Sequence, residues 1–325
     1  MNANEILQVD GLKSYYRSPE GYLKAVDGVS FAIEKREVMG LVGESGCGKT
    51  TVALSMMKLL PTSAEIMGGR VLFHGEDLLK KTEDEMANIR WRKISIIFQG
   101  ALNSLNPVLS VREQIAEAML AHKTVGADSV DEAIDRLFNA VRLDPHRKNN
   151  YPHELSGGMK QRVMIAMALA CNPEIVIADE PTTALDVIVQ RRVLELIRSL
   201  CKELELAVVL ITHDLSVVAE LCDKVAIMYA GKIVEFGEIY NVFESPKHPY
   251  TQGLLRSLPK MKEKKTEISY IPGSVPDLTG PLPACRFYSR CPYAQKVCAE
   301  KEPPFEVVSP GHQTACHFWK EVEQS

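Results

Sequence analysis

Residues 43–50 match the pattern G-x-x-x-x-G-K-[ST] at every fixed position, and they read Gly43-Glu44-Ser45-Gly46-Cys47-Gly48-Lys49-Thr50. The apolar run 38–42 before them is typical of a buried strand. Residues 51–60 after them are typical of a helix that ends at Pro61. In a strand–loop–helix unit of this kind, the glycines let backbone N–H groups surround an anion, and the helix N-terminus adds partial positive charge.

The residue types in this loop also indicate the ligand. The Lys49 ammonium can reach the β- and γ-phosphates of a nucleotide, and the Thr50 hydroxyl can hold Mg²⁺. We therefore predict a nucleoside triphosphate site with Mg²⁺. The residues expected at the nucleotide are Gly43, Ser45, Gly46, Cys47, Gly48, Lys49, Thr50 and Thr51.

Length and composition are ordinary for a globular protein. The chain has 325 residues, 46% hydrophobic and 25% charged, which suits one large domain with an appendage or two domains. A formal net charge of −4 gives no electrostatic footprint for nucleic acid. No segment reaches the roughly 18 apolar residues of a membrane span, and residues 1–5 do not begin a signal peptide. We expect a cytosolic protein that meets membranes through partners.

The pattern of apolar runs predicts an α/β fold. Residues 5–37 alternate apolar and polar residues as short half-buried strands do, and residues 100–170 are largely helical in pattern. The runs 175–178 and 207–211 are apolar throughout, with a helical pattern at 187–204 between them. Strand, helix and strand in this order predict a right-handed crossover in a parallel sheet.

The composition changes near the C-terminus. Residues 224–237 predict a hairpin that turns at 230–232, and residues 260–265 carry four lysines typical of a solvated linker. From 271 onward the chain is rich in proline, cysteine and turn signals, with too little apolar material for a core of its own. We therefore expect two domains, at 1–257 and 258–325.

Two carboxylates end the predicted strand at 175–178. Asp179 lies where a parallel sheet delivers side chains to a ligand, and one aspartate suffices for Mg²⁺ that also binds phosphate and water. Glu180 is the candidate to orient or deprotonate an attacking water. A strand that simply ends in solvated acids is the alternative, and the phosphate-loop pattern upstream makes it the weaker one.

A second anion-binding helix start follows from Leu155-Ser156-Gly157-Gly158. Two glycines after a serine expose backbone N–H groups at the start of a helix over 159–170. An ordinary N-cap would explain Ser156 but not the paired glycines. A single nucleotide site needs only one such loop, so the second one requires another explanation.

With these motifs the chain resembles the nucleotide-binding subunits of ATP-binding cassette (ABC) proteins over roughly residues 5–240. The resemblance implies a P-loop NTPase fold with a RecA-like core, an antiparallel β subdomain and a helical subdomain at about 100–170. Leu155–Gly158 is similar to the family's signature loop, which closes over the γ-phosphate held by the opposite subunit. Ser156, Gly157, Gly158 and Gln161, and Asp186 of the D-loop Ala184-Leu185-Asp186, would then serve the partner's nucleotide.

The resemblance also implies roles for residues that spacing alone does not assign. Gln99 matches the Q-loop glutamine, which touches Mg²⁺ or water, and His213 matches the switch histidine at the γ-phosphate. Tyr15 is at the position of the ring that stacks on adenine, with Tyr16 as the alternative. The expected catalytic residues are Glu180, His213 and Gln99, and the expected Mg²⁺ ligands are Thr50, Gln99 and Asp179.

Further stretches are similar to the ATPase subunits of dipeptide and oligopeptide importers. They are Ser104–Val108, Met159, Pro181–Val187, Ser245–Thr251 and Ile271–Gly273. The likeness implies a second ATPase subunit in a homo- or heterodimer, two membrane permeases, an external solute-binding protein and a place at the cytoplasmic face of the membrane. Gly100-Ala101 and Arg36 depart from the pattern, since Asp-Pro and a turn glycine are usual there.

Four of the eight cysteines crowd the tail, namely Cys285, Cys291, Cys298 and Cys316. Five, six and seventeen residues separate successive members, so the close pairs of structural zinc sites are absent. Four thiolates from a loop-rich segment suit an iron–sulfur cluster. Members of the group resembled carry a 4Fe–4S cluster on such a module, so this is the expectation, with Zn²⁺ or unliganded thiols as alternatives.

Three other functions remain open from the sequence. A related importer could carry nickel or another solute. A soluble ABC ATPase could act on nucleic acid, although the chain has no long insertion between Gln99 and Ser156 and no basic stripe. A non-hydrolysing regulatory subunit would commonly have lost Glu180, His213 or a signature glycine, and this chain retains all three.

Overall fold

The computed structural model describes residues 4–100, 104–183, 185–257 and 270–322. The chain forms two compact units. Unit 1 contains Met1–Ile33, Met39–Leu79 and Thr212–Ser325, and unit 2 contains Glu34–Val38 and Lys80–Ile211. The expected linker at 260–265 and Ala184 of the D-loop lie outside the described residues.

Unit 1 begins with an antiparallel sheet in the order β2-β1-β4-β5. Its register places Leu7 opposite Phe73 and Val9 opposite Val71. These side chains are buried, as are Ile6 and Leu12 of the same strand. The strands are β1 (Glu5–Ser18), β2 (Gly21–Glu34), β4 (Ala64–Phe73) and β5 (Glu76–Asp77). Helix α1 (Lys49–Met56) packs on β1 with its buried face, so the antiparallel sheet supports the helix that follows the glycine-rich loop.

A second group of unit 1 strands lies around β9. Strand β3 pairs with β9 in parallel, and β9 forms an antiparallel hairpin with β10 that confirms the hairpin expected at 224–237. Strand β12 then pairs with β10, and β11 pairs with β12. The bounds are β3 (Val38–Val42), β9 (Lys224–Tyr229), β10 (Lys232–Glu238), β11 (Glu306–Ser309) and β12 (His312–Thr314). The proline-rich C-terminal segment thus adds strands to an existing sheet.

The remaining helices of unit 1 are short. They are α7 (Leu215–Leu221), α8 (Ile239–Glu244), α9 (Pro249–Arg256), α10 (Lys296–Glu300) and α11 (Trp319–Val322). Helix α9 begins at Pro249, where the missing N–H of proline costs nothing. Buried aromatic rings pack beside it, with Tyr229 of β9 4.7 Å from Tyr250 and 5.1 Å from Phe287 between ring centroids.

Unit 2 contains the expected parallel strands. Strands β6 (Ile94–Ile97), β7 (Ile175–Asp179) and β8 (Ala207–Thr212) pair in parallel in this order. Helix α6 (Val187–Glu203) connects β7 to β8, which confirms the strand–helix–strand prediction. Every residue of β7 is buried, because a parallel sheet is covered on both faces.

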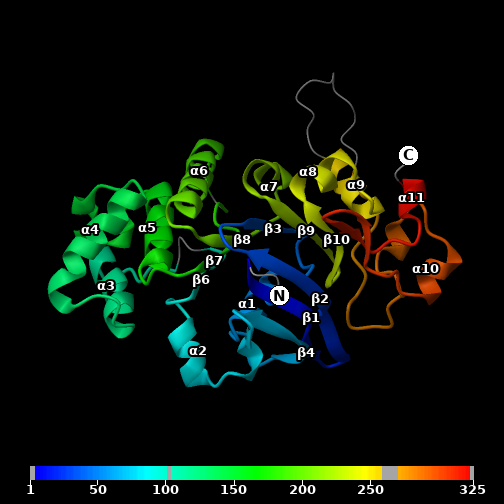
Figure 1. Cartoon of the computed structure of the whole chain (residues 1–325), viewed down its shortest axis with the longest axis horizontal. Coiled ribbons are helices and arrows are strands. Elements are labelled where there is room, and N and C mark those ends of the chain that lie inside the picture. Colours follow the sequence, from blue (N-terminus) through cyan, green and yellow to red (C-terminus); the bar gives the residue numbers. More distant parts are fainter. Residues whose placement is uncertain (1–3, 101–103, 184, 258–269, 323–325) are drawn as a thin grey trace. The chain divides into compact units, whose positions relative to one another are not determined.

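The helical part of unit 2 consists of three helices that pack against one another (Figure 1). They are α3 (Val111–Ala121), α4 (Val130–Ala140) and α5 (Gly157–Leu169), and the shorter α2 (Glu83–Ile89) precedes them. Ser110 starts α3 with a capping box to Glu113. None of the helices in the described ranges is long and apolar enough to cross a membrane.

Candidate functional site

Three glycines shape the loop at 43–50, two through their backbone angles and two through close contacts. Gly46 and Gly48 have φ of 79° and 105°, in the region that side chains disfavour. A Cβ on Gly48 would lie 2.1 Å from the Ala25 carbonyl oxygen, and one on Gly43 would lie 2.0 Å from that of Met228. The loop therefore sits directly on the surrounding backbone of unit 1.

Lys49 is held inside this loop. Its side chain is buried, and Nζ donates hydrogen bonds to the carbonyl oxygens of Gly43 at 2.8 Å and Glu44 at 3.0 Å. The Cys47 side chain is fully buried and burial raises the pKa of its thiol, while its backbone N–H donates to the Glu44 carbonyl at 3.2 Å. The loop thus presents one cation and several backbone donors, which suits phosphate groups.

Helix α1 carries the two threonines expected at the nucleotide. Thr50 is exposed, whereas Thr51 is buried and its Oγ1 lies 3.3 Å from the Tyr16 hydroxyl. The Tyr15 hydroxyl donates to Asp27 Oδ1 at 2.6 Å, and burial together with this hydrogen bond raises the pKa of Tyr15 to about 12. Both tyrosines are half-buried, and the role of either ring at adenine stays a prediction.

The carboxyl end of β7 carries the two acids in unit 2. Asp179 is 2% exposed, and Glu180 follows with φ of 47°, a conformation that non-glycine residues adopt rarely and often at functional sites. Gln99 Nε2 donates to Glu180 Oε2 at 3.0 Å, and Thr183 Oγ1 donates to the same oxygen at 2.9 Å. The structure thus brings the side chains of Gln99 and Glu180 together, and their catalytic roles stay a prediction.

The second glycine-rich loop starts α5. Ser156 is the N-cap, and its Oγ accepts the Met159 N–H at 3.4 Å. A Cβ on Gly158 would lie 2.6 Å from Cγ1 of Val189. Asp186 starts α6 in the same way, with Oδ1 accepting the Val189 N–H at 2.9 Å, so the two loops are neighbours. Gln161 is 2% exposed, and among the described residues its Nε2 has no hydrogen-bond partner.

His213 follows β8 on the exposed surface of unit 1. The next residue, Asp214, caps helix α7 through a hydrogen bond from the Ser216 N–H at 2.8 Å. Asp214 N–H also donates to Thr212 Oγ1 at 3.0 Å. These contacts fix the backbone on both sides of His213.

The four tail cysteines line one small cavity of unit 1. Cys285 and Cys298 are linked by a backbone hydrogen bond of 2.8 Å. Burial raises the pKa of the thiol to about 11 for Cys291 and about 12 for Cys316, so these thiols are protonated in the absence of a metal. Among the described residues, no three histidine, cysteine or acidic side chains are arranged to hold a metal ion. Four thiol groups around one cavity have the donor chemistry that an iron–sulfur cluster or zinc requires.

Sequence reasoning missed two arginines of the C-terminal segment. Arg290 forms a two-pronged ion pair with Glu44 of the phosphate loop, and Arg286 pairs with Asp27, the partner of Tyr15. Their only signal in the sequence is that each directly flanks a cysteine of the tail. Pairing across such long stretches of chain leaves no local pattern.

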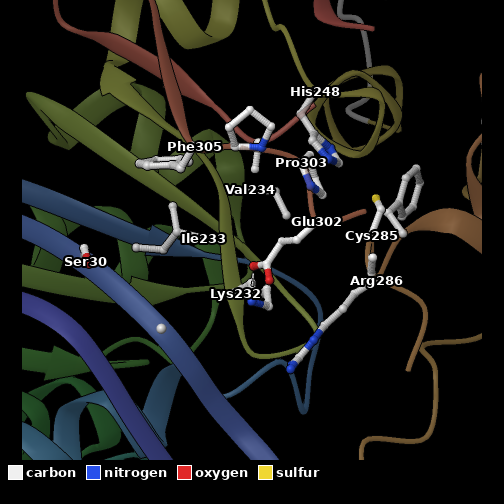
Figure 2. A pocket seen from close by; sticks show the side chains of 15 residues that line it. Ser30, Lys232, Ile233, Val234, His248, Cys285, Arg286, Glu302, Pro303 and Phe305 are labelled. Carbon is white, nitrogen blue, oxygen red and sulfur yellow. Dashed lines mark hydrogen bonds and ion pairs between the residues drawn. The ribbon is translucent and has the colours of Figure 1, made fainter. Parts of the chain in front are cut away.

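Figure 2 shows a further cavity of unit 1, of about 320 Å³, between β10 and the C-terminal segment. Lys232 and Glu302 form an ion pair in its wall, and Arg286 extends away from Cys285 beside them (Figure 2). The apolar part of the lining includes Phe305 and Val234. Because the charged groups of the wall are already paired within the protein, the cavity by itself indicates no ligand.

Two family models match the chain. One, described as ABC transporter, matches residues 26–183. The other, described as Oligopeptide/dipeptide transporter, C-terminal region, matches residues 234–298. The second match covers Cys285, Cys291 and Cys298 of the tail.

Several curated proteins are similar over nearly the whole chain. A probable peptide ABC transporter ATP-binding protein of Sinorhizobium fredii, y4tR, is 46% identical over 99% of this chain and 96% of its own length. The oligopeptide transport ATP-binding protein OppD of Salmonella typhimurium is 44% identical over the same shares. The dipeptide transport ATP-binding protein DppD of Bacillus subtilis is 44% identical over 96% of this chain and 94% of its own.

Solved structures share the fold. The ATP-binding cassette MJ0796, a dimer in a post-hydrolysis state bound to ADP and Pi, is 27% identical with a TM-score of 0.64, over 72% of this chain and 98% of its own. The cbiO1 protein of Clostridium perfringens, part of the cbiONQ ABC transporter complex, is 28% identical with a TM-score of 0.65, over 74% of this chain and 91% of its own.

Proposed function

Because the chain belongs to the ABC transporter family, among the ATP-binding subunits of peptide transporters, we propose that it is the ATP-hydrolysing motor of a dipeptide or oligopeptide importer. As a member of this family it is an ATPase, which converts ATP and water to ADP and phosphate. The match of residues 234–298 to the peptide-transporter C-terminal region favours peptides over nickel or another solute.

The observation that carries the catalytic assignment is the hydrogen bond from Gln99 to the Glu180 carboxylate at the end of β7. Phosphoryl transfer to water needs a positioned water and charge stabilisation rather than covalent help. A carboxylate held by an amide and by the Thr183 hydroxyl is in a fixed position to accept a proton from water. We assign Glu180 as the base, Gln99 as its positioning partner and His213 as a contact of the γ-phosphate.

We assign ATP itself to the glycine-rich loop, with Gly43, Ser45, Gly46, Cys47, Gly48, Lys49, Thr50 and Thr51 at the phosphates and Tyr15 at adenine. Mg²⁺ would be held by Thr50, Gln99 and Asp179. Their hydroxyl, amide and carboxylate oxygens are the hard donors that this cation prefers, and Asp179 is a buried carboxylate that a bound cation would stabilise. When bound, Mg²⁺ supplies positive charge to the phosphate oxygens.

The second nucleotide-binding surface serves a partner subunit in this proposal. Ser156, Gly157, Gly158, Gln161 and Asp186 would complete the ATP site of another ATPase subunit, in a homo- or heterodimer. Ser156 and Asp186 are exposed, and next to Asp186 the apolar side chains of Val187 and Ile188 are 81% and 68% exposed. Exposed apolar residues beside helix-capping loops support a protein interface there.

The importer assignment brings further partners. We propose that two integral permeases bind the dimer at the cytoplasmic face of the membrane and that an external solute-binding protein delivers peptides. The chain would be a peripheral subunit. A net charge of −4 supports the view that nucleic acid is not a partner.

We also propose that residues 258–325 form a C-terminal module whose cysteines bind a 4Fe–4S cluster, with Zn²⁺ as the alternative. The support is that all four cysteines line one cavity. Visible absorbance and metal analysis of the purified subunit test this. Bound iron with a broad absorbance band in the visible range supports the cluster, and bound zinc without colour supports the alternative. If the subunit contains neither metal, the proposal is wrong.

The motor assignment is tested by Glu180→Gln in the purified transporter complex. We expect the rate of ATP hydrolysis to fall by about 100-fold or more because the general base is lost, while ATP still binds and an ATP-bound dimer accumulates. Glu174→Gln is the matched control, since Glu174 directly precedes β7 and pairs on the surface with Lys93 at 2.8 Å. Unchanged hydrolysis in Glu180→Gln removes Glu180 from the role of base.

The solute is tested in the same complex in vesicles with its binding protein. Dipeptides or oligopeptides are expected to stimulate ATP hydrolysis, and Ni²⁺ is not. Stimulation of ATP hydrolysis by Ni²⁺ alone would assign the chain to a nickel importer and not to a peptide importer.

A further inference from the structure

The C-terminal segment contributes two buried cations, one paired with the phosphate loop and the other with β2. The side chains of Arg286 and Arg290 are 4% and 5% exposed. A charge can be buried at this depth only where its partners compensate for the lost hydration. The partners of both arginines therefore show what each one does.

Arg290 holds Glu44, the second residue of the phosphate loop. Nη1 donates to Glu44 Oε2 at 2.9 Å and Nη2 to Oε1 at 3.0 Å, the two-pronged geometry that fixes a carboxylate in both position and orientation. Nε donates to the Pro272 carbonyl at 2.9 Å, and the guanidinium lies over the Tyr229 ring. Burial alone would lower the pKa of Arg290, but the hydrogen bonds to Glu44 and Tyr229 raise it overall, so the guanidinium keeps its charge.

The backbone of Glu44 is held as well. Its N–H donates to the hydroxyl of fully buried Tyr250 at 3.0 Å, and its carbonyl accepts from Lys49 Nζ at 3.0 Å. Glu44 is thus fixed through its side chain, its N–H and its carbonyl. A change in its orientation would move a carbonyl that sets the position of the phosphate-binding lysine.

Arg286 contacts residues near the expected adenine end of the nucleotide site. It forms an ion pair with Asp27 and donates to the Ala230 carbonyl. Asp27 accepts the Tyr15 hydroxyl at 2.6 Å, so Arg286, Asp27 and Tyr15 form one chain of contacts. Burial opposes ionisation of Asp27, but Tyr15 and Arg286 outweigh it and lower the pKa of the carboxyl overall.

We propose that Arg290, acting through Glu44, and Arg286, acting through Asp27 and Tyr15, are positioning residues for ATP, so that the C-terminal segment sets the affinity of the nucleotide site. This inference rests on the proposed role of residues 43–51 and Tyr15 in binding ATP. Neither arginine touches the nucleotide. The contact of Arg290 with Glu44 positions the groups that bind the phosphates. The contacts from Arg286 through Asp27 position the Tyr15 ring expected at adenine.

The test measures the Kd of the full-length chain by displacement of a fluorescent ATP analogue, with ATP and inorganic triphosphate as competitors. Arg290→Lys keeps the charge but loses the two-pronged geometry, and Glu44→Gln is isosteric and serves if the arginine variant does not fold. Each is expected to raise the Kd of both competitors about tenfold. The double variant is expected to be no weaker than the worse single one, since both remove the same contact.

The series of contacts from Arg286 through Asp27 to Tyr15 is tested by Tyr15→Phe, which retains the ring and removes its hydroxyl. This variant is expected to raise the Kd for ATP several-fold and to leave that for inorganic triphosphate unchanged. Arg112→Lys is the matched control for Arg290→Lys, because Arg112 forms a two-pronged pair with Asp131 at 2.8 and 2.7 Å in the helical part of unit 2.

Three outcomes would overturn the inference. The first is an unchanged Kd in Arg290→Lys and Glu44→Gln, and the second is a rise in Kd in Arg112→Lys as large as that in Arg290→Lys. The third is an equal rise in the Kd for ATP and for inorganic triphosphate in Tyr15→Phe. Lys49→Ala separates this inference from the proposed function. If Lys49→Ala loses ATP while the other variants bind it normally, only the positioning role fails. If Lys49→Ala binds ATP as the native chain does, the assignment of the site itself fails.

Discussion

The glycine-containing loops that precede helices α1 and α5 differ in what surrounds them. At 43–50 the glycines have positive φ and lie against backbone carbonyls of Ala25 and Met228. At 156–158 the loop is held by a local serine cap, and the atom nearest to a Cβ on Gly158 is a side-chain methyl of Val189. Backbone from distant parts of the chain encloses the first loop. The second loop is held by its own serine cap and lies against the side chain of Val189.

The difference matches two ways of binding an anion. A loop fixed by Arg290, Tyr250 and two carbonyls has little freedom left to lose when phosphates bind, which increases affinity. A loop with an exposed serine cap suits a surface that meets its ligand only when a partner subunit brings it. The comparison thus supports assigning the first loop to this chain's ATP and the second to the ATP of a partner subunit.

The largest effect is expected from a methyl group added to each loop. Gly48→Ala places Cβ against a carbonyl at 2.1 Å and keeps φ near 105°. It should lower the free energy of unfolding by about 3 kcal/mol and weaken ATP binding by about 100-fold or more. Gly158→Ala faces only a valine methyl and should cost about 1 kcal/mol, with ATP binding to the isolated chain unchanged.

Denaturant unfolding and displacement of a fluorescent ATP analogue measure both effects. The contrast between the loops is wrong if Gly158→Ala weakens ATP binding by the isolated chain as much as Gly48→Ala does. Hydrolysis by the assembled complex adds a second readout, because Gly158→Ala should lower it through the partner's site.

The same contrast shows what the sequence could predict. The order of strand, loop and helix around residues 43–50, the strands β7 and β8 and the hairpin β9–β10 were predicted correctly, because each follows from a pattern of neighbouring residues. The end of the first helix was not, since α1 ends at Met56 and not at Pro61. The contact of Gln99 with Glu180 agrees with their positions at the carboxyl ends of two parallel strands, which share one edge of a sheet, although only the family resemblance assigned Gln99 to the site.

Other features could not be read from the sequence. The pairing of Arg290 with Glu44 depends on how the C-terminal segment folds back, and the positive φ of Glu180 depends on tertiary packing. The four cysteines do come to one cavity, but cysteine spacing alone does not decide whether their sulfur atoms reach the distances of a metal site.

The next effect is a pH dependence in the support of the phosphate loop. His248 caps helix α9 by accepting the Tyr250 N–H at 3.1 Å, and burial lowers the pKa of His248 to about 3. Between about pH 6.5 and 3 the unfolded chain binds a proton that the folded chain excludes. The free energy of unfolding should therefore fall by about 1.4 kcal/mol per pH unit from this group as the pH decreases through that range.

His248→Asn removes the titration and keeps an oxygen that can cap the helix. Unfolding by denaturant at several pH values between 7.5 and 4.5 should show that the stability of the native chain relative to the variant falls as the pH decreases. Buried Glu235, which accepts the His248 N–H at 3.0 Å, is common to both proteins and cancels in the difference. Parallel curves would show that the pKa of His248 is not lowered in the folded chain.

The smallest effect separates positive φ from close contact, the two properties that coincide in the phosphate loop. Arg36 has φ of 63° but stands in an exposed turn, where related ATPases were expected to carry glycine. Arg36→Gly should raise the free energy of unfolding by about 0.5 kcal/mol, because relief of strain of about 1–2 kcal/mol exceeds the entropy cost of glycine. Arg36→Ala is the matched control, since it also loses the exposed ion pair with Glu205 but retains the strained backbone. Equal stability of the two variants in denaturant unfolding would mean that positive φ alone costs little here, and that the intolerance expected at Gly48 comes from its contact with the Ala25 carbonyl.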